Sequence, residues 1–294
     1  MMNLNTLNNA NIITRDINTN RATLKPITEK IKGGHCCVDG CTCEKAYNRV
    51  AVFGQNNGVY LCDYHYNGGK YSYHQRQDYL KHDGVRKTSD GMTIGYELES
   101  VGFDKDVYAW LAFNKYLPTS DCTVTIEWIS PVFTSFSGIT KQLATIEYFN
   151  NNPNYNFSVL NSRCGLHTHY GYKNQPISAN IRNNCKEIFQ PLCDYIANLS
   201  IDNQRRFFGR ALCDTSYCNA RMYDSDTHES MFNLQHTYTI EFRLLKFSNA
   251  ENTVKMMKII RAVLELLFKN DGKVDNAIIA QEMVKKLDKE LSRF

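Results

Sequence analysis

The sequence predicts an α+β fold, in which a sheet with one apolar face and one chemically active face is built from strands separated by helices. Two observations support this. Four stretches after residue 92 alternate apolar and polar side chains with the period of two that β-strands show. Between and after them, apolar residues recur with the spacing of amphipathic helices. The chain has 294 residues and is 43% hydrophobic, enough for one large domain or two smaller ones.

Charge and cysteine content narrow the class of protein. The net charge of +4 comes from 34 basic and 30 acidic residues, a balance that does not by itself indicate nucleic-acid binding. The eleven cysteines form an odd number, and no N-terminal apolar segment of the secretory type is present. No apolar run approaches the roughly 18 residues of a membrane helix. We therefore expect a soluble, cytoplasmic protein with no membrane contact.

Composition divides the chain into four segments. Residues 1–33 are rich in Asn and Thr and are predicted to be a flexible extension. Residues 34–66 hold five of the cysteines and form a candidate zinc-binding module. Residues 67–91 are polar and are predicted to be a linker. Residues 92–294 form the main domain.

The candidate zinc module has two pairs of possible ligands joined by a predicted hairpin. Cys36 and Cys41 flank a short spacer that ends in Gly40, which permits a tight turn. Cys62 and His65 form a C-x2-H pair directly after a strand-like stretch. Thiolates and imidazoles bind Zn²⁺ in tetrahedral sets of four. A zinc ion here is expected to be structural, because four protein ligands leave no open position.

Spacing alone also allows Cys37 to pair with Cys41, or Cys43 to act as a ligand, and a group of reduced thiols without metal is the alternative. The stretch CCVDGC…LCDYHY is similar to small zinc-binding segments of phage and bacterial proteins that read C-x-V-x-G-C…C-x-x-H-Y. That resemblance covers about thirty residues. It implies the ligands Cys36, Cys41, Cys62 and His65, in a zinc-ribbon-like module. The sequence leaves open whether such a module docks onto nucleic acid or onto protein.

Each predicted strand of the main domain has apolar residues on one face and acids, histidines or an arginine on the other. The polar side chains are Glu97 and Glu99 in 93–99, Glu127 in 122–130, His167 and His169 in 163–172, and Glu241 and Arg243 in 239–245. Any one of these could be an ordinary solvated face. Ordinary solvent faces favour Lys, Thr and Ser, whereas this set has one cation and no Lys. The joint pattern therefore indicates a functional face.

Helical spacing predicts four helices, and two regions are left without a helix. The helices are 139–150, 178–200 with Pro191 either kinking it or marking a helix start, 253–269 and 275–292. Residues 107–116 show a mixed pattern, and residues 201–236 are predicted to be irregular.

Carboxylates and imidazoles on one face suit Mg²⁺ or Mn²⁺, which bridge phosphate oxygens. An arginine beside them suits a phosphoryl group, because its fork matches two phosphate oxygens. Enzymes that transfer a phosphoryl group from a nucleotide commonly use metal ions together with an arginine. No Walker loop or Rossmann glycine pattern is present, so nucleotide binding would need a different fold.

Four motifs, in this order, resemble the amidoligase family of phages, bacteria and fungi. They are GYELE at 95–99, EWISP at 127–131, CGLHTH at 164–169 and TIEFR at 239–243. The family belongs to the carboxylate–amine ligase superfamily of glutamine synthetase and glutamate–cysteine ligase, and the match covers roughly residues 92–247. It implies a curved antiparallel sheet with helices on its convex face, and a concave face that binds divalent ions and ATP.

The resemblance also implies roles for single residues. Arg243 would stabilise the transferred phosphoryl group, Arg221 is a candidate second phosphate contact, and His169 would lie near the nucleotide or substrate. Asp121 stands where relatives often carry an acid, but Cys-Thr follows it in place of their Gly-Ser. The implied metal ligands are Glu97, Glu99, Glu127, His167 and Glu241.

The implied activity is ATP-dependent formation of an amide from a carboxylate and an amine, with Mg²⁺ or Mn²⁺ at the site and structural Zn²⁺ elsewhere. The substrates could be an amino acid, a peptide or a protein side chain, selected by loops 100–120 and 201–236. Two alternatives stay open: a zinc-module binding protein with an inactive ligase-like domain, and a metal-dependent hydrolase or nuclease that uses His167 and His169. The sequence leaves the oligomeric state open.

Overall fold

The computed structural model describes residues 34–43, 46–55, 58–72, 91–120, 124–173, 175–216, 218–222 and 229–294. These residues belong to two compact units: an N-terminal unit, up to residue 70 and again over 103–117, and a sheet unit of residues 71–102 and 118–294. The boundaries expected from composition did not separate residues 103–117 from the main domain. The predicted flexible extension, and residues 73–90 of the predicted linker, lie outside the described residues.

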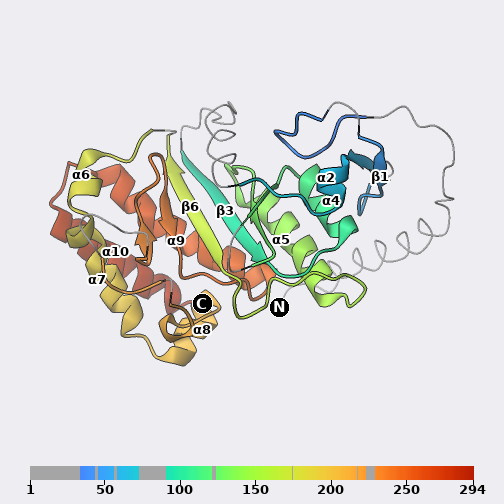
Figure 1. Cartoon of the computed structure of the whole chain (residues 1–294). Helices are drawn as coiled ribbons and strands as arrows, with labels where there is room; N and C mark the ends of the chain where they lie inside the picture. Colours follow the sequence, from blue (N-terminus) through green and yellow to red (C-terminus); the bar gives the residue numbers. More distant parts are fainter. Residues whose placement is uncertain are drawn as a thin grey trace. The chain divides into compact units, whose positions relative to one another are not determined.

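The described residues of the N-terminal unit form a short hairpin and two helices (Figure 1). Its elements are β1 (Asn48–Val50), β2 (Val59–Leu61), α2 (Asp63–Tyr66) and α4 (Lys105–Phe113). The strands pair antiparallel, with Arg49 opposite Tyr60. The Asp104 side chain caps α4 by accepting hydrogen bonds from the next turn's backbone. Residues 107–112 of α4 are all buried, and this explains the mixed pattern, because a helix buried all round has no amphipathic period.

The sheet unit is mixed α/β, and its sheet is open and not a barrel. Its strands are β3 (Met92–Ser100), β4 (Leu117–Thr119), β5 (Ile126–Ile129), β6 (Leu166–Tyr172), β7 (Phe232–Asn233) and β8 (Ile240–Phe242), in the spatial order β4-β5-β3-β6-β8-β7. Every pairing with a described register is antiparallel. The four predicted strands correspond to β3, β5, β6 and β8, whereas β4 and β7 were not predicted.

Strand register brings the predicted polar residues opposite one another. The directly opposed pairs are Glu97 with His167, Glu99 with Glu127, His169 with Glu241, and Glu241 with Asn233. On the other face, Tyr96, Thr168 and Phe242 are aligned across β3, β6 and β8. Since neighbouring residues of paired strands share a face, the predicted division into a polar and an apolar face is confirmed.

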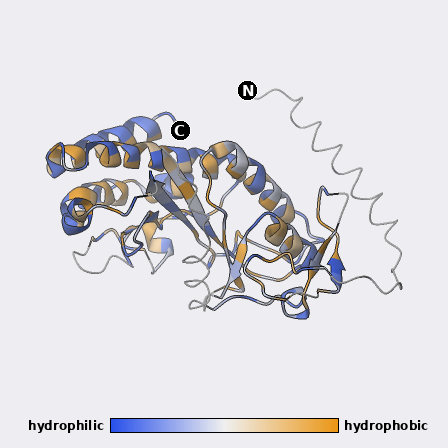
Figure 2. Ribbon diagram, turned by 90° about the horizontal axis from the view of Figure 1, so that it is seen from above, coloured by the Kyte–Doolittle hydropathy of each residue, from blue (hydrophilic) through white to orange (hydrophobic). Residues whose placement is uncertain are grey.

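Helices pack on the apolar face and on one another. They are α5 (Phe136–Asn151), α6 (Ala179–Asn183), α7 (Cys185–Ala197), α8 (Ile201–Phe208), α9 (Ala250–Asn270) and α10 (Asn276–Leu291), with the 3-10 turn η2 (Leu212–Asp214). Phe189 of α7 lies against Phe232, and Phe208 of α8 lies against Phe242, whereas α10 packs on α7 and α9. The hydroxyl of Tyr170 on β6 donates a hydrogen bond to the Met257 carbonyl on α9, at 3.2 Å. Figure 2 shows the hydrophobic stripes along these helices. Among the described helices, none has an apolar stretch long enough to cross a bilayer.

Two helix predictions differ from the structure. The predicted helix 178–200 is divided at Asn184 into α6 and α7, and Pro191 lies inside α7 and does not mark a start. Residues 201–208 of the region predicted to be irregular form α8, which begins after the cap Ser200 and ends at Gly209, with a φ of 78°. Its apolar stripe is short, so the spacing signal was weak.

Candidate metal centres

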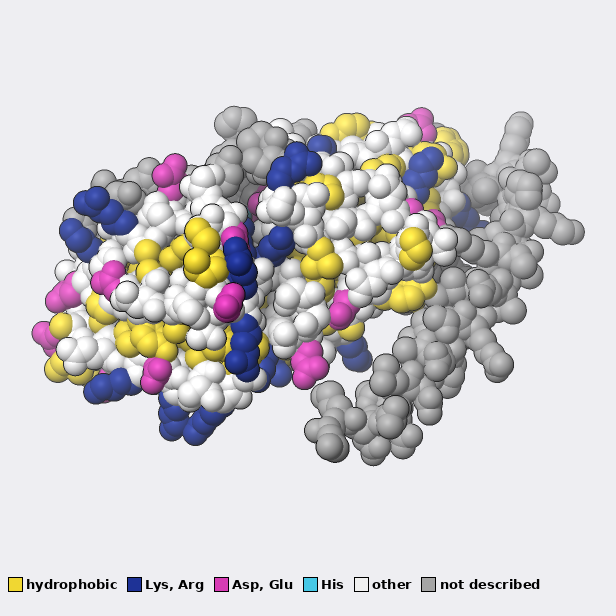
Figure 3. All heavy atoms as spheres, turned by 90° about the horizontal axis from the view of Figure 1, so that it is seen from below, with side chains coloured by type: hydrophobic (Ala, Val, Ile, Leu, Met, Phe, Trp, Pro, Cys, Tyr) yellow, Lys and Arg dark blue, Asp and Glu magenta, His cyan; other side chains and the backbone are white. Residues whose placement is uncertain are grey.

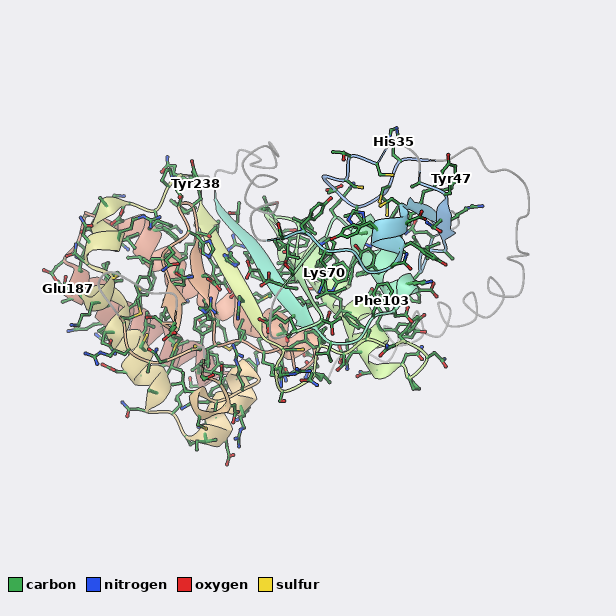
Figure 4. The ribbon with its side chains drawn as sticks, in the orientation of Figure 1. His35, Tyr47, Lys70, Phe103, Glu187 and Tyr238 are labelled. Carbon is green, nitrogen blue, oxygen red and sulfur yellow. The ribbon has the colours of Figure 1, made fainter. Side chains whose placement is uncertain are left out.

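Three cysteines and one histidine of the N-terminal unit form the cysteine–histidine cluster: Cys36, Cys41, Cys62 and His65. Their ligand atoms all lie within 4.8 Å of one another, and Figure 4 shows sulfur atoms grouped near the labelled His35. Cys62 follows β2 directly, and α2 carries His65 three residues later. Gly40, with a φ of 73°, forms the turn that returns Cys41 toward Cys36.

The donor atoms of this cluster have the spacing that a tetrahedral zinc ion requires. His65 Nδ1 lies 3.3 Å from Cys36 Sγ and 3.3 Å from Cys62 Sγ, and the sulfurs of Cys41 and Cys62 are 3.9 Å apart. Two thiolates bound tetrahedrally to Zn²⁺ at about 2.3 Å would be about 3.8 Å apart. The four residues chosen by resemblance are therefore brought together and could hold a metal such as zinc.

Protonation of the cluster fits a metal site. Burial lowers the pKa of His65 to about 4, so its imidazole is neutral at pH 7, the form that binds metal. Burial, together with the neighbouring Cys36 and Cys62, raises the pKa of Cys41 to about 12, so the thiolate of Cys41 needs a nearby cation to form. Cys37 and Cys43, which spacing left open, lie outside the cluster.

The polar face of the sheet carries a second group, the carboxylate cluster of Glu97, Glu127 and His167. All three residues are buried, on β3, β5 and β6. His167 Nδ1 lies 3.6 Å from Glu97 Oε2. The hydroxyl of Thr119 on β4 donates to Glu127 Oε2 at 2.8 Å and orients that carboxylate. Two carboxylates and one imidazole form a donor set suited to Mg²⁺ or Mn²⁺.

Beside it lies the two-histidine cluster of His169, His236 and Glu241. His236 stands in the turn between β7 and β8, and its Nε2 is 3.1 Å from Glu241 Oε2. The rings of His169 and His236 meet edge to face, with centroids 4.8 Å apart. The Asn233 amide donates to Glu241 Oε2 at 2.6 Å.

Two carboxylates connect the clusters, because each points its two oxygens at different imidazoles. Glu97 Oε1 lies 3.4 Å from His169 Nε2, while its Oε2 faces His167. Glu241 Oε1 lies 3.3 Å from His167 Nδ1, while its Oε2 faces His236. Carboxylates in this arrangement can bridge two neighbouring divalent ions.

Glu241 is ionised in this setting. Burial alone would raise the pKa of its carboxyl, but the hydrogen bond with His236 and the nearby charges of His169 and His167 hold that pKa well below its usual value. The sheet therefore provides a buried carboxylate, 1% exposed, that could bind a cation.

Two buried arginines stand next to these acids. Arg243 Nη1 donates to Glu241 Oε1 at 2.9 Å, while its Nε is buried and has no hydrogen-bond partner among the described residues. Arg210 donates through Nε to the Leu244 carbonyl at 3.1 Å and through Nη2 to the Arg243 carbonyl. Burial lowers the pKa of Arg210, yet a guanidinium stays charged at neutral pH.

Glu99, predicted from the resemblance to bind metal, lies at the edge of the carboxylate cluster and is not a member of it. Its Oε2 accepts a hydrogen bond from the Gly165 backbone, and its Oε1 is 4.0 Å from His167 Nε2. A Cβ at Gly165 would lie 3.1 Å from His167 Nε2, so a larger residue here would require that side chain to shift by a few tenths of an ångström. That Glu99 binds metal stays a prediction.

Arg221 is exposed, between η2 and β7. Its backbone N–H donates to Asn219 and its carbonyl accepts from Ser230. These backbone contacts hold the segment in place, and the role of Arg221 as a phosphate contact stays a prediction. Asp121 lies outside the described residues.

Sequence reasoning missed His236, Asn233 and Arg210 as site residues. All three lie in the region predicted to be irregular, and each reaches the site through its contact with Glu241 or Arg243. A weak signal was present for Asn233, because Phe232 and Asn233 alternate apolar and polar just before a turn and β8.

Figure 4 labels Tyr238, in the chain leading to β8. Its carbonyl oxygen would lie 3.2 Å from a Cβ at Gly171 of β6, so this glycine lets the two segments approach closely. The close approach supports the β6–β8 pairing that brings His169 to Glu241.

No protein-family model matches the chain, and no curated protein is significantly similar to it.

Proposed function

We propose that the sheet unit is an ATP-dependent carboxylate–amine ligase that forms an amide bond through an acyl phosphate. The observation that carries this is Arg243: a buried guanidinium held by Glu241, with an Nε that has no hydrogen-bond partner among the described residues, beside two carboxylate–imidazole clusters. An unsatisfied buried donor next to candidate metal ligands suits an anionic group such as a phosphate.

The carboxylate cluster and the two-histidine cluster would hold the divalent ions. Bound there, such ions would neutralise the charge of the ATP phosphates. Arg243 would donate to the transferred γ-phosphoryl group, and Glu241 would keep the guanidinium aligned through the 2.9 Å hydrogen bond. Arg210 supports this arrangement by donating to the Arg243 carbonyl.

The proposed reaction has two steps. A carboxylate oxygen of one substrate attacks the γ-phosphorus of ATP, and the bond to ADP breaks. The nitrogen of the amine substrate then attacks the acyl carbon, inorganic phosphate leaves, and the amine loses a proton. The substrates belong to the class of amino acids, peptides or protein side chains.

The proposal includes a finer fold and a second metal. The sheet would curve around its polar face as in glutamine synthetase, with the helices on the convex side. Zinc in the cysteine–histidine cluster would be structural, because Cys36, Cys41, Cys62 and His65 leave no open coordination position.

The test is ADP release that requires a carboxylate, an amine and a divalent ion together. Glu241→Gln removes a ligand charge and the acceptor of Arg243, so we expect a rate about 100-fold to 1,000-fold lower, the range for loss of a preorganised electrostatic group. The control is Glu282→Gln, the same chemical change at an exposed position of α10, which should keep the wild-type rate. Release of ADP that does not depend on the amine, or a rate of ADP release that is unchanged in Glu241→Gln, would contradict the proposal.

A metal-dependent hydrolase is the second candidate, favoured by the bridging geometry of Glu97 and Glu241, which two-metal hydrolases also use. Hydrolysis of a phosphate ester or nucleic acid without ATP would support it. On the face drawn in Figure 3, basic and acidic side chains of the described residues are interspersed.

A further inference from the structure

The two clusters of the sheet face differ in chemistry, although they share bridging carboxylates. We propose that the two-histidine cluster is a site for a transition-metal ion such as Mn²⁺, while the carboxylate cluster binds Mg²⁺. His236 is the ligand that gives the two-histidine cluster its preference for the transition-metal ion. The inference deepens the proposed function and rests on it only for the use of divalent ions at this face.

The positions of the donor atoms support direct coordination. His236 Nε2 and Glu241 Oε2 are 3.1 Å apart. Two ligands bound at about 2.1 Å and at a right angle would be about 3.0 Å apart. The third ligand, His169, comes from β6, so the cluster draws on two strands and the turn between β7 and β8.

The donor type sets the preferred ion. Mg²⁺ binds oxygen ligands and keeps several waters, so a site with two imidazoles and one carboxylate suits it poorly. First-row transition ions accept imidazole readily, and sets of two histidines and one carboxylate are typical of them. The carboxylate cluster has the reverse composition, two carboxylates and one histidine.

Supporting hydrogen bonds orient the ligands, as outer partners do at established metal sites. His169 Nδ1 lies 3.4 Å from the Thr239 hydroxyl, which leaves Nε2 facing Glu97. Asn233 donates to Glu241 Oε2 at 2.6 Å and keeps that carboxylate turned toward His236.

The cluster is open on one side. The side chain of His236 is 36% exposed, in contrast to 2% for Glu241. Gly95 lies directly opposite His169 on β3, and a Cβ there would meet nothing closer than Ser130 Oγ at 3.9 Å. The space next to His169 is therefore not filled by a neighbouring side chain of β3, which leaves room for an ion with its waters.

The experiment counts bound Mn²⁺ by electron paramagnetic resonance, with full-length, zinc-loaded protein, no ATP and millimolar Mg²⁺. We expect one Mn²⁺ per chain that Mg²⁺ does not displace. In His236→Gln the affinity for Mn²⁺ should fall at least about 100-fold. Loss of a supporting outer partner alone costs about 10-fold to 100-fold, and a direct ligand should cost no less. The matched control His35→Gln removes an exposed histidine outside the clusters and should bind Mn²⁺ as the wild type does.

A second variant tests selectivity. His236→Asp replaces the imidazole by a carboxylate, so the site should still bind an ion but lose the preference for Mn²⁺ over Mg²⁺. Unchanged zinc content and melting temperature show that both variants are folded.

Mn²⁺ binding in His236→Gln that equals the wild type, or displacement of Mn²⁺ by Mg²⁺ in the wild type, overturns the inference. Retained Mn²⁺ binding without amine-dependent ADP release would overturn the proposed ligase function alone.

Discussion

The N-terminal unit and the sheet unit both gather metal-binding side chains, but they do so in different ways. In the N-terminal unit the donors stand on a loop, a strand end and a one-turn helix, around a hairpin whose strands have three residues each. In the sheet unit the donors stand mostly on paired strands whose other face is packed by long helices. We infer that metal helps to fold the first unit, whereas the fold of the second exists before metal binds.

Loss of a cluster thiolate should have the largest effect on folding. It tests the inference that metal helps to fold the N-terminal unit. In Cys62→Ser we expect loss of zinc and of the folded N-terminal unit, because structural zinc contributes roughly 10–16 kcal/mol of apparent binding free energy in small modules. Zinc analysis and backbone NMR signals would measure this.

Two observations serve as controls for that variant. Cys37→Ser changes a thiol outside the cluster and should keep both zinc and the NMR signals. Signals of the sheet unit should be the same in both variants, and their loss in Cys62→Ser would show that the two units do not fold separately.

The second prediction concerns the packed face of the sheet. Phe242 is fully buried against Phe208 and Phe232, with ring centroids 5.9 and 5.0 Å away. Phe242→Ala should lower the free energy of unfolding of the sheet unit by about 3–5 kcal/mol, with zinc retained. Denaturant unfolding measures it, and Leu160→Ala, at a 42% exposed leucine of the same unit, should change it by less than about 1 kcal/mol. Similar losses in both variants would contradict the assignment of Phe242 to the core.

The smallest effect is expected from a substitution at Gly165, where the backbone lies close to the carboxylate cluster. In Gly165→Ala the new Cβ would lie 3.1 Å from His167 Nε2 and 3.2 Å from Glu99 Oε2, so these side chains must shift by a few tenths of an ångström. We expect divalent-ion affinity to fall about tenfold, which is about 1.4 kcal/mol. Calorimetric titration would measure it.

Gly91→Ala is the control for that change, because a Cβ at Gly91 would meet nothing within 4 Å. Equal affinity of the Gly165→Ala variant and the wild type would show that the carboxylate cluster tolerates movement of His167.

Much of the sheet could be predicted because strand alternation is a local property. The pattern placed Glu97 and Glu99 on one face of β3 and His167 and His169 on one face of β6, and the structure shows both sets on one polar face. Helix α4 was missed because its residues 107–112 are buried all round, which removes the amphipathic signal.

The sequence by itself determined which side chains share a face, since the period of two depends only on neighbouring residues. Tertiary structure decided which strands lie side by side. As a result, Glu241 lies opposite His169, and its carboxylate contacts Asn233 and His236. It also placed Arg210 behind Arg243. These contacts depend on how segments far apart along the chain pack, and local patterns carry no information on such distances.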